Sequence, residues 1–259
     1  MTNKNKPSPF HRGERDIQSH YGVRDKLEQM GQKFIREYMP DQHREFYQQL
    51  SYVFVGSVDA KGRPWASVLI GQNGFIQSPD DKTLRIETPR IAGDPLSDNL
   101  SLDSPIGLLG IMFDVRRRNR LSTTIASIDN DCIELKVVQA FGNCPQYIQA
   151  RVPSTLAEID QISDIPPKST FNALSNRAQE IIQKADNFYI STYYCADDGS
   201  ESYGADMSHR GGRPGFVRVD NEHSLTFPDY AGNFHFNTLG NISLNPRAGL
   251  LFMDFDSGD

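Results

Sequence analysis

Apolar residues near the N-terminus recur at helical spacing. Within residues 23–39 they lie three or four positions apart, which predicts an amphipathic helix. Pro40 ends this pattern, and Asp41 suits the N-cap of a second helix that continues to Leu50. We therefore expect an N-terminal helical segment over residues 1–50.

Stretches rich in β-branched and aromatic residues follow, separated by turn residues. Residues 51–59 and 65–70 flank the turn at 60–64, and this pattern predicts a β-hairpin. A tight turn is expected at 129–131. This order of elements predicts a first, antiparallel unit over residues 51–150. Its further strands are expected at residues 106–113, 122–128 and 132–140.

The second half of the chain repeats this order. An amphipathic helix is expected over residues 170–184, and residues 99–114 resemble residues 241–255. Self-similarity at this scale predicts a duplicated unit, with a helical connector at 151–186 and a second copy at 187–259. This copy stops before the last two strands of the first, so we expect the chain to be a fragment of a longer protein. Its strands and turn are expected at residues 188–194, 197–200, 203–207, 216–219 and 225–227.

Composition and charge narrow the classes of protein. The chain has 259 residues, of which 37% are hydrophobic and 10% aromatic, as in an ordinary globular protein. A formal net charge of −6 argues against nucleic-acid and anionic-membrane partners, which select basic surfaces. Residues 1–9 lack the apolar core of a signal peptide, and no later run is long enough to span a membrane. A cytoplasmic location is therefore expected.

Cysteine and histidine spacing excludes several common sites. The three cysteines, Cys132, Cys144 and Cys195, contain no C-x-x-C pair, and an odd number argues against a disulfide framework. The six histidines form neither an i, i+4 pair nor an HExxH motif, so no metal site is expected. A G-x-S-x-G elbow and a GxGxxG loop are also absent from the sequence.

A glycine- and arginine-rich connection between two expected strands is the strongest candidate site. Glycines allow the backbone to approach a ligand, and Arg210 and Arg213 carry planar guanidinium groups that suit an anion. The alternative is a solvated hairpin, the more common role of such a turn. A second polar turn, residues 228–233, would face the same end of the sheet. The polar and aromatic groups in and after that turn are Tyr230, Asn233, His235, Asn237 and Thr238.

These motifs resemble the flavin-binding branch of the pyridoxamine 5'-phosphate oxidase-like split β-barrel proteins. The resemblance rests on the run Ser208-His209-Arg210-Gly211-Gly212-Arg213-Pro214-Gly215-Phe216-Val217-Arg218-Val219, then Pro228-Asp229, Gly232-Asn233, Asn241-Ile242, Asn245-Pro246 and Gly249-Leu250-Leu251-Phe252. It implies an α+β fold of mainly antiparallel β-structure, a tandem split β-barrel with flanking helices, and FMN as the cofactor.

The resemblance also implies which residues contact FMN. Arg210 would bind the phosphate or the pyrimidine edge of the ring, and His235 the phosphate. Ser208 and Asn233 would contact the ribityl chain or the phosphate, while glycines allow a close backbone approach. The expected cofactor-binding residues are Ser208, His209, Arg210, Gly211, Gly212, Pro214, Gly215, Phe216, Tyr230, Asn233, His235 and Asn241.

Two functions from different classes are consistent with this resemblance. One is an FMN-dependent oxidoreductase, or the flavin module of a larger one, with a nicotinamide or iron–sulfur electron donor and a homodimeric assembly. The alternative is a non-catalytic domain that holds flavin or haem for sensing, with His209 or His235 as an axial ligand. Pyridoxamine-phosphate oxidation is not expected, because residues 255–259 lack the Arg-rich segment that closes those enzymes. The sequence also has Phe234-His235 where family members usually place basic residues.

Three other stretches receive structural interpretations. Residues 116–120, rich in arginine, are interpreted as a solvated rim at a strand end. The run 142–148 also resembles this flavin-binding branch and is interpreted as a turn, with Cys144 as an inert thiol. Residues 69–77 of the first copy lie opposite the candidate site but carry neither arginine nor histidine. One FMN per chain is therefore expected.

Overall fold

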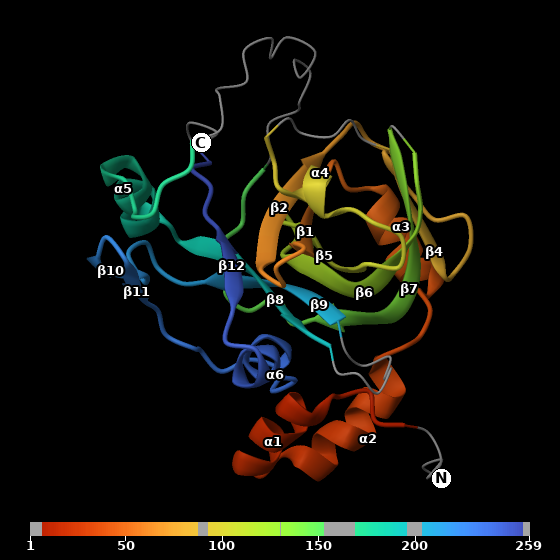
Figure 1. The fold of residues 1–259 in the computed structure, drawn as a ribbon. Helices are drawn as coiled ribbons and strands as arrows, with labels where there is room; N and C mark the ends of the chain where they lie inside the picture. The colour runs from red at the N-terminus through yellow and green to blue at the C-terminus, as the bar shows by residue number, and fades with distance from the viewer. Residues whose placement is uncertain (1–6, 88–92, 130, 153–168, 196–203, 256–259) are drawn as a thin grey trace.

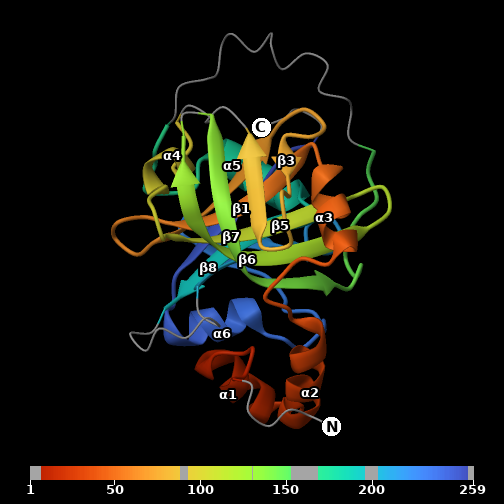
Figure 2. The same cartoon turned by 90° about the vertical axis from the view of Figure 1, so that its right-hand side faces the viewer.

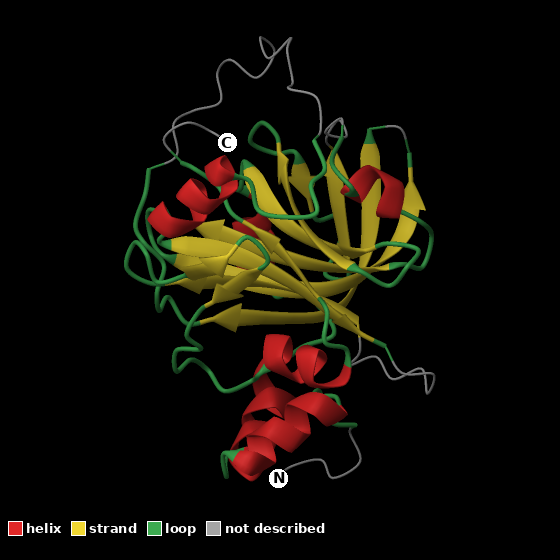
Figure 3. Cartoon of the chain, turned by 60° about the vertical axis from the view of Figure 1, so that its left-hand side comes forward, coloured by secondary structure: helices red, strands yellow, loops and turns green. Residues whose placement is uncertain are grey.

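The computed structural model of the chain describes residues 7–87, 93–129, 131–152, 169–195 and 204–255. The structure is mainly antiparallel β with flanking helices, so this part of the predicted fold class is confirmed. Figure 1 shows two N-terminal helices beneath the strands, and Figure 3 shows the same division between helical and β regions.

The N-terminal segment contains three helices, α1 (Arg12–His20), α2 (Arg24–Phe34) and α3 (Asp41–Gln48). Helix α1 was not predicted because its sequence is highly polar. Its start is capped by His11, whose ring accepts a hydrogen bond from the Gly13 amide. Helix α2 ends five residues before the expected Met39. After Phe34 the chain becomes extended, and Arg36 pairs with Ala140 of the large sheet. Met39 is then buried in the main core.

The first half of the chain forms a curled, seven-stranded antiparallel sheet (Figure 2). The strand order is β2-β1-β5-β6-β7-β4-β3, and helix α4 (Leu96–Asn99) precedes β5. Phe46 and Tyr47 of α3 pack with leucines of β5 and β6 in the main core. The strands are β1 (Tyr52–Val58), β2 (Pro64–Ile70), β3 (Ile76–Gln77), β4 (Thr83–Glu87), β5 (Pro105–Met112), β6 (Arg117–Ile128) and β7 (Cys132–Asn143).

The second half forms a three-stranded antiparallel sheet in the order β12-β8-β9. It packs against the first sheet, where the rings of Phe54 and Tyr189 stack with centroids 3.6 Å apart. A separate hairpin, β10 with β11, lies beside helix α5 (Figure 1). The elements of this half are α5 (Asn176–Lys184), β8 (Asn187–Tyr194), β9 (Gly204–Gly211), β10 (Arg218–Asn221), β11 (Ser224–Thr226), α6 (Asn237–Leu244) and β12 (Ala248–Leu251).

Both halves contain the same order of elements: a helix, a hairpin, a smaller hairpin, a helix and a strand. Their registers also correspond. Gly56 lies opposite Gly107 in the first half, and Ser191 lies opposite Gly249 in the second. One hydrogen bond recurs as well, since Asn99 donates to Ser57 and Asn241 donates to Thr192. The tandem split-barrel interpretation stays a prediction that these correspondences motivate.

The boundary of one strand matters for function. The strand before the glycine- and arginine-rich run was expected to end at Met207, but β9 continues to Gly211. Ser208, His209 and Arg210 therefore lie on a strand that pairs with β8, and the connection that follows is shorter than expected. The strand can extend this far because hydrogen bonding to β8 continues up to Asn187 opposite Gly211.

Some predictions fall outside the described residues. These are the turn at 197–200, residues 153–168 of the connector at 151–186, one residue of the turn at 129–131, the first residue of the strand at 203–207 and the last four residues of the second copy. Among the residues that the structure describes, no helix has the length and apolar character needed to cross a membrane.

Candidate functional site

A cavity of about 240 Å³ lies where the two halves of the chain meet. Strand β6 and the segment after β7 provide the walls from the first half. Strand β9 and residues 228–239 provide the walls from the second half, and Tyr21 adds the N-terminal helical segment. The cavity is therefore built from three regions that are far apart in the sequence.

Three arginines and a histidine make the floor of this cavity basic. Arg118 and Arg120 come from β6, and His209 and Arg210 come from β9. Arg118 Nη1 lies 3.1 Å from His209 Nδ1, and Arg210 Nη1 donates to Asp229 Oδ1 at 2.8 Å. Arg120 forms an ion pair with the Asp206 carboxylate.

The floor carries more positive than negative charge. Burial, together with repulsion from Arg118 and Arg210, lowers the pKa of Arg120 to about 9, and burial lowers that of Arg118 to about 10. Burial and the neighbouring arginines also lower the pKa of His209 well below its usual value, so its ring is neutral at neutral pH. Of the three guanidinium groups, Arg120 pairs with Asp206 and Arg210 with Asp229, while Arg118 contacts the neutral His209, so an anion would be stabilised here.

Several donors on this floor have no hydrogen-bond partner among the described residues. These are Nε of Arg118, Nε of Arg210 and Nε2 of His209. Leaving a buried polar group unpaired costs about 1–3 kcal/mol, and more for a charged group. A ligand with acceptor oxygens would remove this cost, so the residues fit an anionic group such as a phosphate.

The interpretation of residues 116–120 as a solvated rim is wrong for two of the arginines. Arg120 is only 7% exposed, and Arg118 is half-buried in the cavity. The reason is strand alternation, because β6 begins at Arg117 and directs residues 118 and 120 to the same face. The i, i+2 spacing of these arginines was the available signal. Arg116, in the preceding turn, is exposed as expected.

Seven of the twelve predicted cofactor-binding residues line the cavity. Ser208 donates to Asp206 at 3.0 Å and accepts from Thr238 at 2.9 Å. Gly211 lies so close to the Tyr147 carbonyl that any side chain at this position would clash with it. The seven residues are Ser208, His209, Arg210, Gly211, Phe216, Tyr230 and Asn233.

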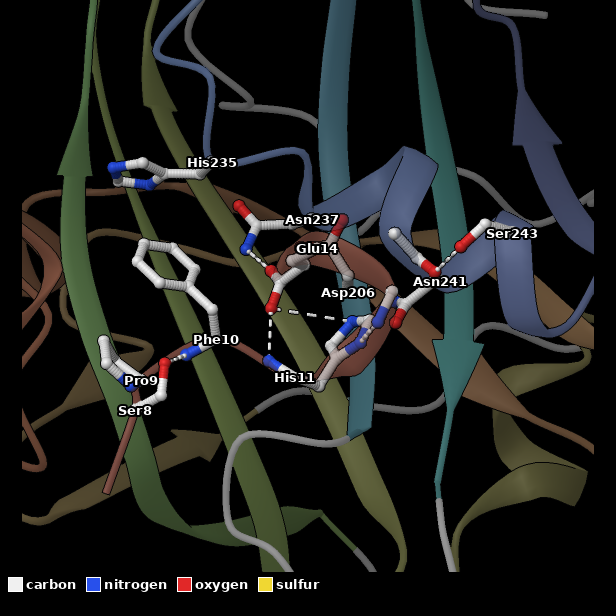
Figure 4. A network of polar contacts seen from close by, with 12 residues as sticks. Ser8, Pro9, Phe10, His11, Glu14, Asp206, His235, Asn237, Asn241 and Ser243 are labelled. Atoms are coloured by element: carbon white, nitrogen blue, oxygen red, sulfur yellow. Dashed lines mark hydrogen bonds and ion pairs between the residues drawn. The ribbon is translucent and has the colours of Figure 1, made fainter. Parts of the chain in front are cut away.

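The other five predicted residues lie outside the described cavity walls. The His235 ring packs beside Phe10 and Phe141, with centroids 5.5 and 5.7 Å away (Figure 4). Burial lowers the pKa of His235 to about 4, so it carries no charge for a phosphate at neutral pH. Asn241 donates to Thr192. The remaining three, Gly212, Pro214 and Gly215, belong to the connection after β9, where the Gly212 and Gly215 amides donate to main-chain carbonyls of 185–186.

The segment 142–148 links the two halves over the cavity. Its Asn143, Cys144, Gln146 and Tyr147 line the walls, and the Tyr147 backbone adopts a left-handed φ of 66°. Asn233 donates to Asn143 at 2.9 Å. Tyr147 Oη donates to the carbonyl of residue 231 at 3.0 Å, and its ring stacks on Tyr230 at 5.2 Å. The segment is therefore a wall of the cavity as well as a turn.

Aromatic side chains line the exposed side of the cavity, here called its mouth, where Tyr21 and Phe234 are 60% and 39% exposed. Tyr21 stacks on Phe236 with centroids 5.2 Å apart, and Phe234 lies edge-on to Phe236. Sequence reasoning missed all three, because Tyr21 comes from a polar helix end and the two phenylalanines resemble ordinary core residues. The positive φ values of Phe234 and Phe236, 59° and 62°, bring both to the cavity. A flat aromatic ligand would have stacking partners here.

A buried carboxyl group lies behind the floor. Glu14 of α1 accepts hydrogen bonds from the Asn237 side chain and, at 2.8 Å, from the His11 amide (Figure 4). Asn237 lines the cavity and accepts from Arg120 Nη1 at 3.2 Å. Burial raises the pKa of Glu14 to about 8, so this carboxyl is protonated at neutral pH. Helix α1 is thus connected to the ligand cavity by polar contacts.

No family model matches the chain, and no curated protein sequence matches it. Solved structures similar to it include HupZ from Group A Streptococcus, at 15% identity over 40% of this chain and 93% of that one, with a TM-score of 0.33. An FMN-binding protein from Syntrophomonas wolfei matches at 12% identity over 48% and 96%, with a TM-score of 0.30. HutZ, the haem storage protein from Vibrio cholerae, matches at 13% identity over 38% and 88%, with a TM-score of 0.28.

Proposed function

We propose that this protein binds FMN in the cavity between its two halves and acts as a flavoprotein, either an oxidoreductase or the flavin module of one. The observation that carries this proposal is the group of buried Arg120 and half-buried Arg118 and Arg210, whose guanidinium groups exceed the carboxylates that contact them. An anionic group of a ligand would accept hydrogen bonds from these guanidinium groups. The aromatic residues at the mouth suit a ligand whose other end is a flat ring.

The described residues divide into groups that match the parts of FMN. The three arginines would hold the phosphate, because one guanidinium group can donate two parallel hydrogen bonds to two phosphate oxygens. Ser208, Asn237 and Thr238 offer hydroxyl and amide groups for the ribityl chain. The aromatic residues at the mouth would flank the ring. When bound, the flavin supplies the electron transfer, while the chain supplies binding, orientation and exclusion of water.

Haem is a second candidate, and one observation favours it. His209 lines the cavity, and burial keeps its ring neutral. Its Nε2 would bind iron as the tautomer with the proton on Nδ1, which requires the 3.1 Å contact between Nδ1 and Arg118 Nη1 to open. A neutral imidazole nitrogen is the form that binds haem iron. The absorption spectrum of the purified protein separates the candidates, because flavin and haem absorb at different wavelengths.

A fluorescence titration with FMN tests the proposed function. Wild-type protein should change flavin fluorescence saturably. Arg210→Ala should weaken binding by about 1.5–3 kcal/mol, because a charge-assisted hydrogen bond is lost. Arg116→Ala is the matched control, since it removes an exposed arginine and should change affinity little. No saturable change in the wild type would overturn the proposal, and equal effects of the two substitutions would move the site elsewhere.

A further inference from the structure

Helix α1 packs against α6 at unusually short range. A Cβ atom added to Gly13 would lie 2.8 Å from Ser243 Oγ, and one added to Gly240 would lie 2.7 Å from the Glu14 amide nitrogen. The two glycines therefore allow the helices to approach through their backbones. This packing brings the Glu14 side chain, only 3% exposed, to the N-terminal end of α6 (Figure 4).

A chain of contacts leads from Glu14 to the ligand cavity. Asn237 donates to Glu14 through its amide nitrogen and accepts from Arg120 through its amide oxygen, at 3.2 Å for the second bond. Arg120 in turn pairs with Asp206. Because one amide bridges the carboxyl and the guanidinium, the position of Arg120 depends on the hydrogen bonds that Glu14 makes.

We propose that Glu14 is a positioning residue of the ligand cavity, which acts through Asn237 on Arg120 and couples anion binding to its own protonation. The proposal rests on the proposed function, because it requires an anionic ligand on the arginine floor. With a proton, Glu14 is neutral and Arg120 keeps its full charge for the ligand. Without the proton, the carboxylate competes with the ligand for Arg120 and repels the ligand's negative charge.

The other groups that face Glu14 support this coupling. His11, beside it at the start of α1, has its ring Nε2 3.6 Å from Glu14 Oε2, and burial lowers its pKa to about 4, so it is neutral. Arg24 of α2 also favours the ionised form, but its guanidinium forms an ion pair with Glu28. Arg120 of β6 is the cation that a bound anion would compensate. Burial dominates these effects and holds the pKa of Glu14 near 8.

The sign of the coupling follows from linkage. A bound anion near Arg120 makes ionisation of Glu14 less favourable, so the ligand-bound protein keeps the proton to higher pH than the free protein. FMN affinity should therefore fall as pH rises through 8. The phosphate itself does not titrate in this range, because its second pKa is about 6.

Titrations with FMN at pH 7, 8 and 9 test the inference with Glu14→Gln and a control. Wild-type affinity should fall about tenfold between pH 7 and pH 9: about fivefold from Glu14 at a tenfold coupling, a typical size, and about twofold from Arg120, whose pKa is about 9. Glu14→Gln removes the titrating carboxyl, so its affinity should fall only about twofold, the part that comes from Arg120, whose pKa is about 9. Glu45→Gln, which alters an exposed carboxyl of α3 that does not line the cavity, should follow the wild type.

Each outcome separates the inference from the proposed function. If wild-type protein binds FMN with the same affinity at all three pH values, or if Glu14→Gln is as steep as the wild type, the inference is wrong and the function stands. If wild-type protein binds no FMN at any pH, the function itself fails.

A calorimetric measurement needs no substitution and covers the case in which Glu14→Gln does not fold. Titrating wild-type protein with FMN at pH 8.5, in buffers of different ionisation enthalpy, gives the number of protons taken up per ligand. At a tenfold coupling and a pKa of about 8 in the free protein, Glu14 should take up about half a proton per FMN, and riboflavin, which lacks the phosphate, should give less. Zero uptake with FMN would overturn the inference.

Discussion

At the scale of single residues, burial keeps several histidines neutral. Burial lowers the pKa of His11, His43 and His235 to about 4, and that of His209 well below its usual value. In the unfolded chain the same groups titrate near pH 6.5. Between pH 4 and 6.5 the unfolded state therefore binds more protons than the folded state. Stability should rise with pH across this window.

The first prediction concerns acid stability. The free energy of unfolding should fall as pH decreases from 6.5 to 4, by at most about 1.4 kcal/mol per pH unit for each histidine. Glu14 has the opposite effect on the free energy of unfolding between pH 4.5 and 8, because its raised pKa makes the folded state hold the proton. It is a single group, whereas four histidines act in the other direction. Urea unfolding at several pH values measures the slope, and His43→Gln should make it shallower. A flat profile would contradict the burial of neutral histidines.

At the scale of elements, glycines let the two halves pack strand against strand. A Cβ atom at Gly107 of β5 would lie 2.8 Å from the Asp206 carbonyl carbon of β9. In the corresponding place, a Cβ atom at Gly249 of β12 would lie 2.5 Å from the Pro64 carbonyl oxygen of β2. Both neighbours are backbone atoms in paired strands, which cannot move without loss of sheet hydrogen bonds.

The second prediction follows from this close packing. Gly107→Ala should destabilise the protein by about 1–3 kcal/mol, the usual cost of overpacking a core. Gly232→Ala is the control, because a Cβ atom there would meet no atom within 4 Å. Thermal or urea unfolding of both variants measures the difference. If Gly107→Ala were as stable as Gly232→Ala, the two sheets would not be packed as closely as described.

The third prediction concerns the segment 142–148. Tyr147→Ala removes a stacked ring and a hydrogen bond to residue 231, contacts that together hold this segment on the 228–233 loop. The two interactions are worth about 1–3 kcal/mol together, so bound FMN should dissociate about tenfold faster or more. Stopped-flow release of FMN measures the rate, with Tyr38→Ala as a control at a partly exposed tyrosine away from the cavity. Equal rates would show that the segment does not retain the ligand.

At the scale of the whole molecule, the two halves correspond in register but differ in chemistry. Tyr52 pairs with Ile70 in the first half, and Asn187 pairs with Gly211 in the second. Counting back from those pairs, Leu69 corresponds to Arg210 and Val68 to His209. Leu69 is buried in the apolar core, so the first half has a hydrophobic residue where the second has a cavity arginine.

The fourth prediction is a stoichiometry of one FMN per chain. A phosphate bound at the first half would lack the guanidinium groups that provide the strongest donors, and charge-assisted hydrogen bonds are about twice as strong as neutral ones. Flavin released from saturated, denatured protein, divided by the protein concentration, gives the ratio directly. A ratio near two would mean that the first half also binds flavin.

Local patterns in the sequence determined most of the elements. Runs rich in β-branched, aromatic or other apolar residues predicted β1, β2, β5 and β8 to within two residues, because such side chains pack well on the faces of a sheet. The glycine-rich connection after β9 was predicted for a similar reason. Gly215 adopts a φ of 82°, which few other residues tolerate, so glycine itself marks the turn.

Only the tertiary structure decided which side chains share the cavity. Arg118 contacts His209, which lies 91 positions later in the sequence, and Asn143 contacts Asn233, which lies 90 positions later. His235 lies within the candidate motif, yet its ring turns toward Phe10 because the N-terminal segment offers an apolar contact there. Such pairings depend on how two sheets and a distant helix pack together. Packing brings together surfaces that are far apart in the sequence, so it cannot be predicted from the local pattern of neighbouring residues.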